Sequence, residues 1–151
     1  MNNLTFAHPN LKNTGSAVKF ELHPAEDGRE GHIAMWIAPQ KENTDTKFYA
    51  SFDWDKAIFI RLPILDIAGM LEVFRGYRES LADNKGFFHV YANRNVNIRM
   101  EHRLEPCPLY YFSISQKMGD ERRQITFGFT MCEALVLSEV FTSSLVRMAF
   151  G

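Results

Sequence analysis

Hydrophobic and polar residues alternate along several short stretches of the chain, and twice this alternation gives way to a helical spacing. In residues 17–23, Val18, Phe20 and Leu22 fall on one side of an extended chain and polar residues fall on the other. A period of two is typical of a strand with one buried face. Residues 32–38 are apolar on both faces, so the pattern leaves the orientation of that segment open. The first half of the chain predicts strands at residues 17–23, 32–38, 47–52 and 57–62.

A helical spacing begins directly after the fourth predicted strand. Pro63 suits the first position of a helix, where no backbone donor is needed. Ile64, Ile67 and Phe74 then recur at intervals that place them on one face of a helix. We expect this first helix to run to about Ala82, where turn-forming residues follow it.

The second half of the chain repeats the plan of the first. Thr130 and Glu133 have the spacing of a capping box, in which each side chain bonds to a free backbone N–H of the first helical turn. A second helix is therefore expected to begin at Thr130 and to continue to about Phe150. The strands predicted before it lie at residues 86–92, 96–103, 109–117 and 124–129.

The junction of strand and helix also repeats at the level of sequence. Residues 58–74 read IFIRLPILDIAGMLEVF, residues 125–141 read ITFGFTMCEALVLSEVF, and both segments end in Glu-Val-Phe. Repetition of a supersecondary unit is a property of the whole fold, and the short connections favour antiparallel hairpins over parallel crossovers. We predict an α+β fold with a duplicated ββββα–ββββα plan, in which two antiparallel sheets are each backed by a helix.

The two repeats are expected to share one hydrophobic core. No linker or low-complexity segment separates residues 16–84 from residues 86–150, so we predict a single domain over residues 16–150. With 151 residues, of which 46% are hydrophobic, the chain is large enough to bury such a core. Residues 1–15 are rich in Asn and are predicted to form a flexible N-terminal tail.

Charge and cysteine content limit the classes of function. The net charge of −1 argues against a generally basic nucleic-acid binder, so attraction for an anionic partner must come from a local patch. Cys107 and Cys132 lie in no metal-binding spacing, which predicts reduced thiols in a cytoplasmic protein. The start of the sequence lacks the pattern of a secretory signal. No run of about 18 apolar residues predicts a membrane span.

The outward faces of the predicted strands combine aromatic rings with cations. In the fourth strand the isoleucines point inward, so Phe59 and Arg61 point outward, and the same reasoning turns Phe87, His89 and Tyr91 outward in the fifth. Unpaired bases stack on such rings, and Lys and Arg neutralise the neighbouring phosphates. The candidate nucleic-acid-binding residues are Lys19, Trp36, Lys47, Tyr49, Phe59, Arg61, Tyr91, Arg99, Arg103 and Tyr111.

The sequence holds no arrangement that is typical of an enzyme. Its five histidines have no ligand spacing, and it contains no phosphate-binding glycine loop and no recognisable set of nucleophile, base and orienting group. We therefore predict no catalytic residue, no metal and no small-molecule cofactor. Asp53 and Asp55 flank Trp54 in a segment that is typical of a turn rather than of a carboxylate pair. Trp54 could then provide an additional stacking surface.

The order of four strands and a helix, twice over, resembles the Whirly-type fold. That fold is shared in outline by the Whirly, Pur-alpha and positive-cofactor-4 families and by kinetoplastid guide-RNA-binding proteins. The stretch KAIFIRLPILDIAGMLEVF is also similar to the strand and helix that end the positive-cofactor-4 domain. The resemblance implies binding of single-stranded DNA or RNA on sheet surfaces, without metal or nucleotide, by a homo-oligomer. The Lys-Gly-Lys signature of Whirly proteins has no counterpart, so no binding residue is transferred from the family.

Three functional hypotheses follow from these patterns. The first is a non-catalytic single-stranded DNA-binding protein that stacks bases on the aromatic residues of its sheets. The second is an RNA-binding protein that uses the same surface. The third is a structural protein that buries the aromatic face against another subunit, since exposed apolar surface frequently marks an interface.

Overall fold

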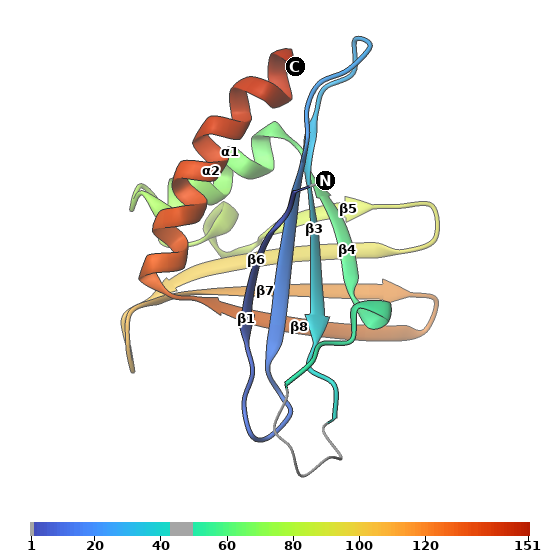
Figure 1. The fold of residues 1–151 in the computed structure, drawn as a ribbon, viewed down its shortest axis with the longest axis vertical. Helices are drawn as coiled ribbons and strands as arrows, with labels where there is room; N and C mark the ends of the chain where they lie inside the picture. Colours follow the sequence, from blue (N-terminus) through green and yellow to red (C-terminus); the bar gives the residue numbers. More distant parts are fainter. Residues whose placement is uncertain (1, 43–49) are drawn as a thin grey trace.

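The chain forms two four-stranded antiparallel sheets, and each sheet is followed by one long helix (Figure 1). The computed structural model describes residues 2–42 and 50–151. The first sheet and its helix comprise β1 (Leu4–His8), β2 (Ser16–His23), β3 (His32–Pro39), β4 (Ile58–Leu62) and α1 (Ile64–Phe74). The second sheet and its helix comprise β5 (Phe87–Val90), β6 (Asn95–Arg103), β7 (Leu109–Met118), β8 (Glu121–Phe129) and α2 (Met131–Phe150). Two short 3-10 helices, η1 (Trp54–Lys56) and η2 (Leu81–Asn84), lie before β4 and β5. The predicted ββββα–ββββα plan is confirmed.

The two halves share one core of aromatic and aliphatic side chains. The strands of one sheet cross those of the other, and α1 and α2 pack side by side (Figure 1). The ring of Phe129 in β8 lies 6.3 Å from that of Phe20 in β2 and 6.2 Å from that of Phe74 in α1, measured between centroids. Phe20 in turn lies 5.8 Å from Phe141 of α2. Rings from both sheets and both helices therefore meet in one apolar cluster.

The first strand lies where the sequence predicted a flexible tail, so that prediction is wrong. Residues Leu4–His8 pair with β2 in an antiparallel register that places Leu4 opposite Phe20. Leu4, Phe6 and His8 alternate with exposed residues, and the two apolar side chains pack against the core. The ring of His8 stacks on Phe127 of β8 at 4.2 Å, which ties this edge strand to the second sheet. A five-residue strand at a sheet edge carries too few apolar positions to be distinguished from a tail.

The strand predicted at residues 47–52 is not among the strands of the first sheet. Residues 43–49, which include Lys47 and Tyr49, lie outside the described residues. Of the described part of that segment, Phe52 forms only an isolated bridge with Gln40. β1 therefore takes the place in the four-stranded plan that the sequence analysis assigned to this segment.

The first helix is shorter than predicted and ends at Phe74 instead of about Ala82. Gly76 has a φ of 77°, in the left-handed region where glycine carries no side-chain penalty. The N–H of Tyr77 donates to the carbonyl of Glu72, and the N–H of Gly76 donates to that of Val73. These two bonds form a Schellman motif, which satisfies the last helical carbonyls and turns the chain away.

The second helix is fixed at both of its ends. The predicted capping box is confirmed, because Glu133 N–H donates to Thr130 Oγ1 at 3.1 Å and Thr130 N–H donates to Glu133 Oε1 at 2.9 Å. At the far end, N–H groups in the β2–β3 loop donate to the carbonyls of Arg147 and Met148. These bonds satisfy acceptors that a helix leaves unpaired. In the part of the chain that the structure describes, no helix has the length and hydrophobicity to cross a membrane.

Candidate nucleic-acid interface

The solvent-facing side of the first sheet gathers an aromatic and basic row across three strands. The register places Lys19 of β2 opposite Trp36 of β3, and Trp36 opposite Phe59 of β4. The rings of Trp36 and Phe59 lie 5.0 Å apart, and Lys19 Nζ lies 4.7 Å from the centre of the Trp36 ring. Ile33 and Ile37 on the same strand are buried, so the orientation of β3 that the sequence left open turns Trp36 outward.

A second tryptophan completes this group from outside the sheet. Trp54 opens η1 and places its ring 4.9 Å from Lys19 Nζ, so the ammonium group contacts both indoles. Cations within about 6 Å of an indole are attracted by the negative face of the ring. We refer to Lys19, Trp36, Trp54 and Phe59 as the tryptophan cluster. Trp54 follows residues 43–49 in the chain, and sequence reasoning identified it only as a turn residue with a possible stacking role.

Arginines near the tryptophan cluster have different roles. Arg61 of β4 is exposed on the same face of the sheet as Phe59. Arg94, in the turn between β5 and β6, instead donates to the carbonyl of Phe59 at 2.5 Å and to Gln116 Oε1 at 2.7 Å. Its guanidinium also lies 4.3 Å from the centre of the Tyr91 ring. Arg94 therefore holds the second sheet against β4, whereas the side chain of Arg61 is exposed and pairs with no carboxylate among the described residues.

The predicted outward placement of Tyr91 is wrong, as is that of Phe87 and His89. Phe87 pairs with Ile98 and His89 pairs with Val96, and both partners are buried, so these two side chains face the core. Tyr91 packs against the core, and its hydroxyl accepts a hydrogen bond from a backbone N–H of β4. The outward residues of β5 are Phe88 and Val90. A run of adjacent apolar residues carries no clear period, so the sequence did not fix which residues face outward.

The remaining predicted residues lie on the outer face of the second sheet. The guanidinium of Arg103 lies 3.9 Å from the centre of the Tyr111 ring and also pairs with Glu101. Arg99 is exposed on the same strand. Arg94 immediately precedes β6 and bonds to Phe59 of the tryptophan cluster, whereas Arg103 is the last residue of β6. Arg103 and Tyr111 therefore lie at the opposite end of this sheet from the tryptophan cluster. The predicted site residues that are described and face outward thus fall into two separate groups: Lys19, Trp36, Phe59 and Arg61 on the first sheet, and Arg99, Arg103 and Tyr111 on the second.

Two histidine contacts beside the candidate site are structural. His23 and His32 stack with their ring centres 4.7 Å apart, and burial, followed by His23 and Arg61, lowers the pKa of His32. His32 is therefore largely neutral near pH 7 and adds little positive charge to the sheet. Asp66 of α1 hydrogen-bonds to His89 of β5, and burial raises the pKa of Asp66 against the opposing effect of His89. Among the described residues no group of three His, Cys, Asp or Glu side chains could hold a metal ion.

Comparison with solved structures confirms the predicted Whirly-type fold. WHY1 from Arabidopsis thaliana matches with a TM-score of 0.72 and 17% identity, over 99% of this chain and 85% of that one. The plant transcriptional regulator PBF-2 matches with a TM-score of 0.71 and 17% identity, over 97% and 81%. A guide-RNA-binding protein complex bound to a guide RNA matches with a TM-score of 0.65 and 16% identity, over 95% and 89%. No protein-family model matches the sequence, and a search of curated proteins finds no relative.

Proposed function

We propose that this chain binds single-stranded nucleic acid, with DNA as the preferred ligand, on the outer face of its first sheet, and that it catalyses no reaction. The observation that carries the proposal is the tryptophan cluster, in which Lys19 contacts the rings of Trp36 and Trp54 beside Phe59. Unpaired bases stack on such rings at about 1–3 kcal/mol per base. The lysine and the exposed Arg61 can then neutralise phosphates.

The comparisons support a nucleic-acid ligand. One solved structure with a similar fold is a guide-RNA-binding protein complex bound to a guide RNA, and another is a transcriptional regulator. The tryptophan cluster favours single strands, because a duplex stacks its bases on each other and hides their faces. The net charge of the chain is −1, and few cations lie near the cluster. We therefore expect the binding affinity to depend only weakly on salt concentration, because each neutralised phosphate adds to that dependence.

A titration of the wild-type protein tests this function. Fluorescence anisotropy would follow labelled single-stranded DNA, single-stranded RNA of the same sequence and duplex DNA at about 50 and about 200 mM salt. We expect tighter binding of the DNA strand than of the RNA strand, much weaker binding of the duplex, and a shallow salt dependence. Tighter binding of RNA would replace the DNA assignment with RNA. No binding of either single strand at low salt would refute the proposed function.

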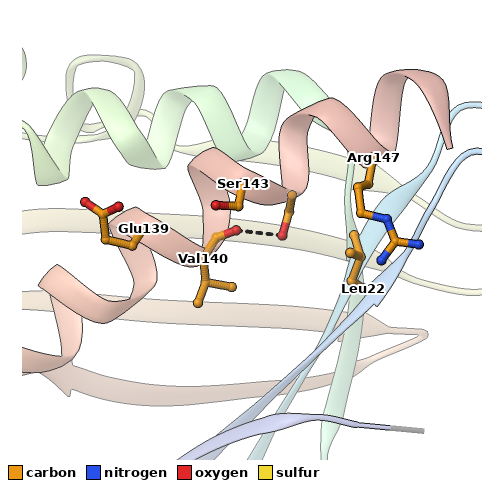
Figure 2. A pocket seen from close by; sticks show the side chains of 6 residues that line it. Leu22, Glu139, Val140, Ser143 and Arg147 are labelled. Carbon is orange, nitrogen blue, oxygen red and sulfur yellow. Dashed lines mark hydrogen bonds between the residues drawn. The ribbon is translucent and has the colours of Figure 1, made fainter.

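We also propose that the chain forms a homo-oligomer through the exposed face of α2. This face carries large apolar side chains that are exposed, and the most exposed of them are Leu135, Val146 and Phe150. A hollow of about 350 Å³ lies along the same helix, with Glu139 and Arg147 separated along the helix by Val140 and Ser143 (Figure 2). An apolar surface of this kind frequently marks an interface. The aromatic face of the first sheet then stays open to a ligand.

The sequence of α2 is self-complementary about Ser143. If a second copy packs antiparallel across a two-fold axis at this residue, Glu139 of each chain faces Arg147 of the other. The same axis places Val140 opposite Val146, and the small side chain at the centre allows close approach. Two-fold interfaces require such matching, because one patch must complement itself. Glu139 and Arg147 are the exposed charged residues of this helix.

Charge reversal tests this interface. Glu139→Arg would place like charges together at both ends of the contact, so we expect the protein to shift toward the monomer. The double variant Glu139→Arg with Arg147→Glu restores opposite charges and should recover the oligomer. Sedimentation velocity measures the mass of each form. A monomeric wild type would contradict the oligomer, and a double variant that stays as monomeric as the single one would contradict the register.

A further inference from the structure

A shallow hollow on the outer face of the second sheet is lined by uncharged polar groups beside an exposed aromatic ring. One row of the sheet register runs through Phe88, Asn97, Ser115 and Gln124, and so crosses all four strands. These residues line a hollow of about 560 Å³. Phe88 is 70% exposed, although it is one of the larger apolar side chains in the protein.

Asn97 and Gln124 present side-chain carbonyl oxygens in this hollow. Asn97 Nδ2 lies 3.3 Å from the carbonyls of both Lys85 and Phe87, and Gln124 Nε2 donates to Ser113 Oγ at 2.8 Å. These bonds occupy both amide N–H groups of Asn97 and one of the two amide N–H groups of Gln124, and no described residue donates to Asn97 Oδ1 or Gln124 Oε1. Two side-chain carbonyl oxygens are therefore available to an incoming donor.

Cations also line the hollow. The next row of the register places Lys117 of β7 opposite Arg122 of β8, and both side chains are exposed and line the hollow. A ring, two acceptors and two exposed cations thus lie within one surface depression. A nucleotide carries the matching groups, namely a flat base, hydrogen-bond donors on its edge and a phosphate.

We propose that this hollow is a second subsite for single-stranded nucleic acid, and that it selects bases that carry an amino group. The proposal rests on the proposed function. The base would stack on Phe88, its amino group would donate to Asn97 Oδ1 or Gln124 Oε1, and its phosphate would contact Lys117 or Arg122. Adenine, cytosine and guanine have exocyclic amino groups, whereas thymine and uracil have none. The tryptophan cluster supplies stacking without such an edge contact, so base preference arises on the second sheet.

The test compares homopolymers and matched variants by fluorescence anisotropy. The wild type is expected to bind oligo-dA and oligo-dC more tightly than oligo-dT. Phe88→Ala should weaken binding of oligo-dC at least about fivefold, the lower bound for loss of one stacked base. Gln124→Leu keeps the size of the side chain and removes the acceptor, so it should reduce the preference for oligo-dC over oligo-dT. Tyr77→Ala is the control, because Tyr77 is 74% exposed and lies outside both groups.

The possible outcomes separate this subsite from the proposed function itself. If Trp36→Ala weakens binding while Phe88→Ala changes no affinity by more than a factor of two, the second subsite is refuted and the proposed function stands. If the wild type shows no preference for amino-bearing bases, the selectivity is refuted. If the wild type binds no single strand, both the second subsite and the proposed function are refuted. If Phe88→Ala changes the oligomeric mass instead of the affinity, the ring belongs to a protein contact.

Discussion

Replacing Trp36 with alanine is expected to weaken binding of a single-stranded oligonucleotide by about 5- to 150-fold, which corresponds to the loss of about 1–3 kcal/mol of stacking. Trp36 is the central member of the tryptophan cluster, since it contacts the ring of Phe59 and the ammonium group of Lys19. Fluorescence anisotropy under fixed salt measures the change.

Two further variants separate stacking from a general loss of structure. Trp36→Phe retains a ring and should recover most of the affinity, whereas Tyr77→Ala removes an exposed ring outside the site and should change nothing. Circular dichroism would verify that each variant is folded. Unchanged affinity in Trp36→Ala, with the wild type binding normally, would contradict the location of the site on the first sheet.

Replacing Phe129 with alanine is expected to lower the free energy of unfolding by about 3–5 kcal/mol. Phe129 is fully buried, and its ring lies 4.9 Å from Phe127, 5.7 Å from Phe112 and 6.5 Å from Phe6 between centroids. It also contacts rings of β2 and α1, so the cavity would open at the centre of the core that joins both halves. Urea denaturation measures the loss.

The matched control for this core substitution is Phe88→Ala. The same ring is removed from a site that is 70% exposed, so we expect a change within about 0.5 kcal/mol. Because one core serves both repeats, the wild type should unfold in a single transition. Two separate transitions, or a loss below about 1 kcal/mol in Phe129→Ala, would contradict the shared core.

The sequence predicted the elements whose signals are local and strong. β4 alternates without a break, and Thr130 with Glu133 carries both partners of the capping box within one turn, so neighbouring residues determined both. The sequence pattern did not predict β1, because this five-residue edge strand is stabilised by pairing with β2 and by the contact with the ring of Phe127. These partners are distant in the sequence. The end of α1 could have been predicted from Gly76, because a glycine two residues beyond the last apolar position of a helix commonly ends it.

The candidate site was predictable only in part, for the same reason. Strand phase placed Lys19 and Phe59 on one face and left the orientation of Trp36 open, and the structure brings all three into contact. The contact with Trp54 depends on the packing of η1 against β3, which no short-range pattern encodes. The phase of β5 depends on pairing with β6, because its own residues are nearly all apolar. Long-range pairing thus determined what the sequence pattern left undecided.

Intrinsic tryptophan fluorescence tests the central claim most directly. The chain contains two tryptophans, and both contact Lys19 in the tryptophan cluster, so their emission reports on that site alone. We predict that adding a single-stranded oligonucleotide quenches the emission and that the quenching saturates over the same concentration range as the anisotropy, while a duplex leaves the emission unchanged. Binding of a single strand with unchanged tryptophan emission would contradict the account, because the ligand would then lie elsewhere on the molecule.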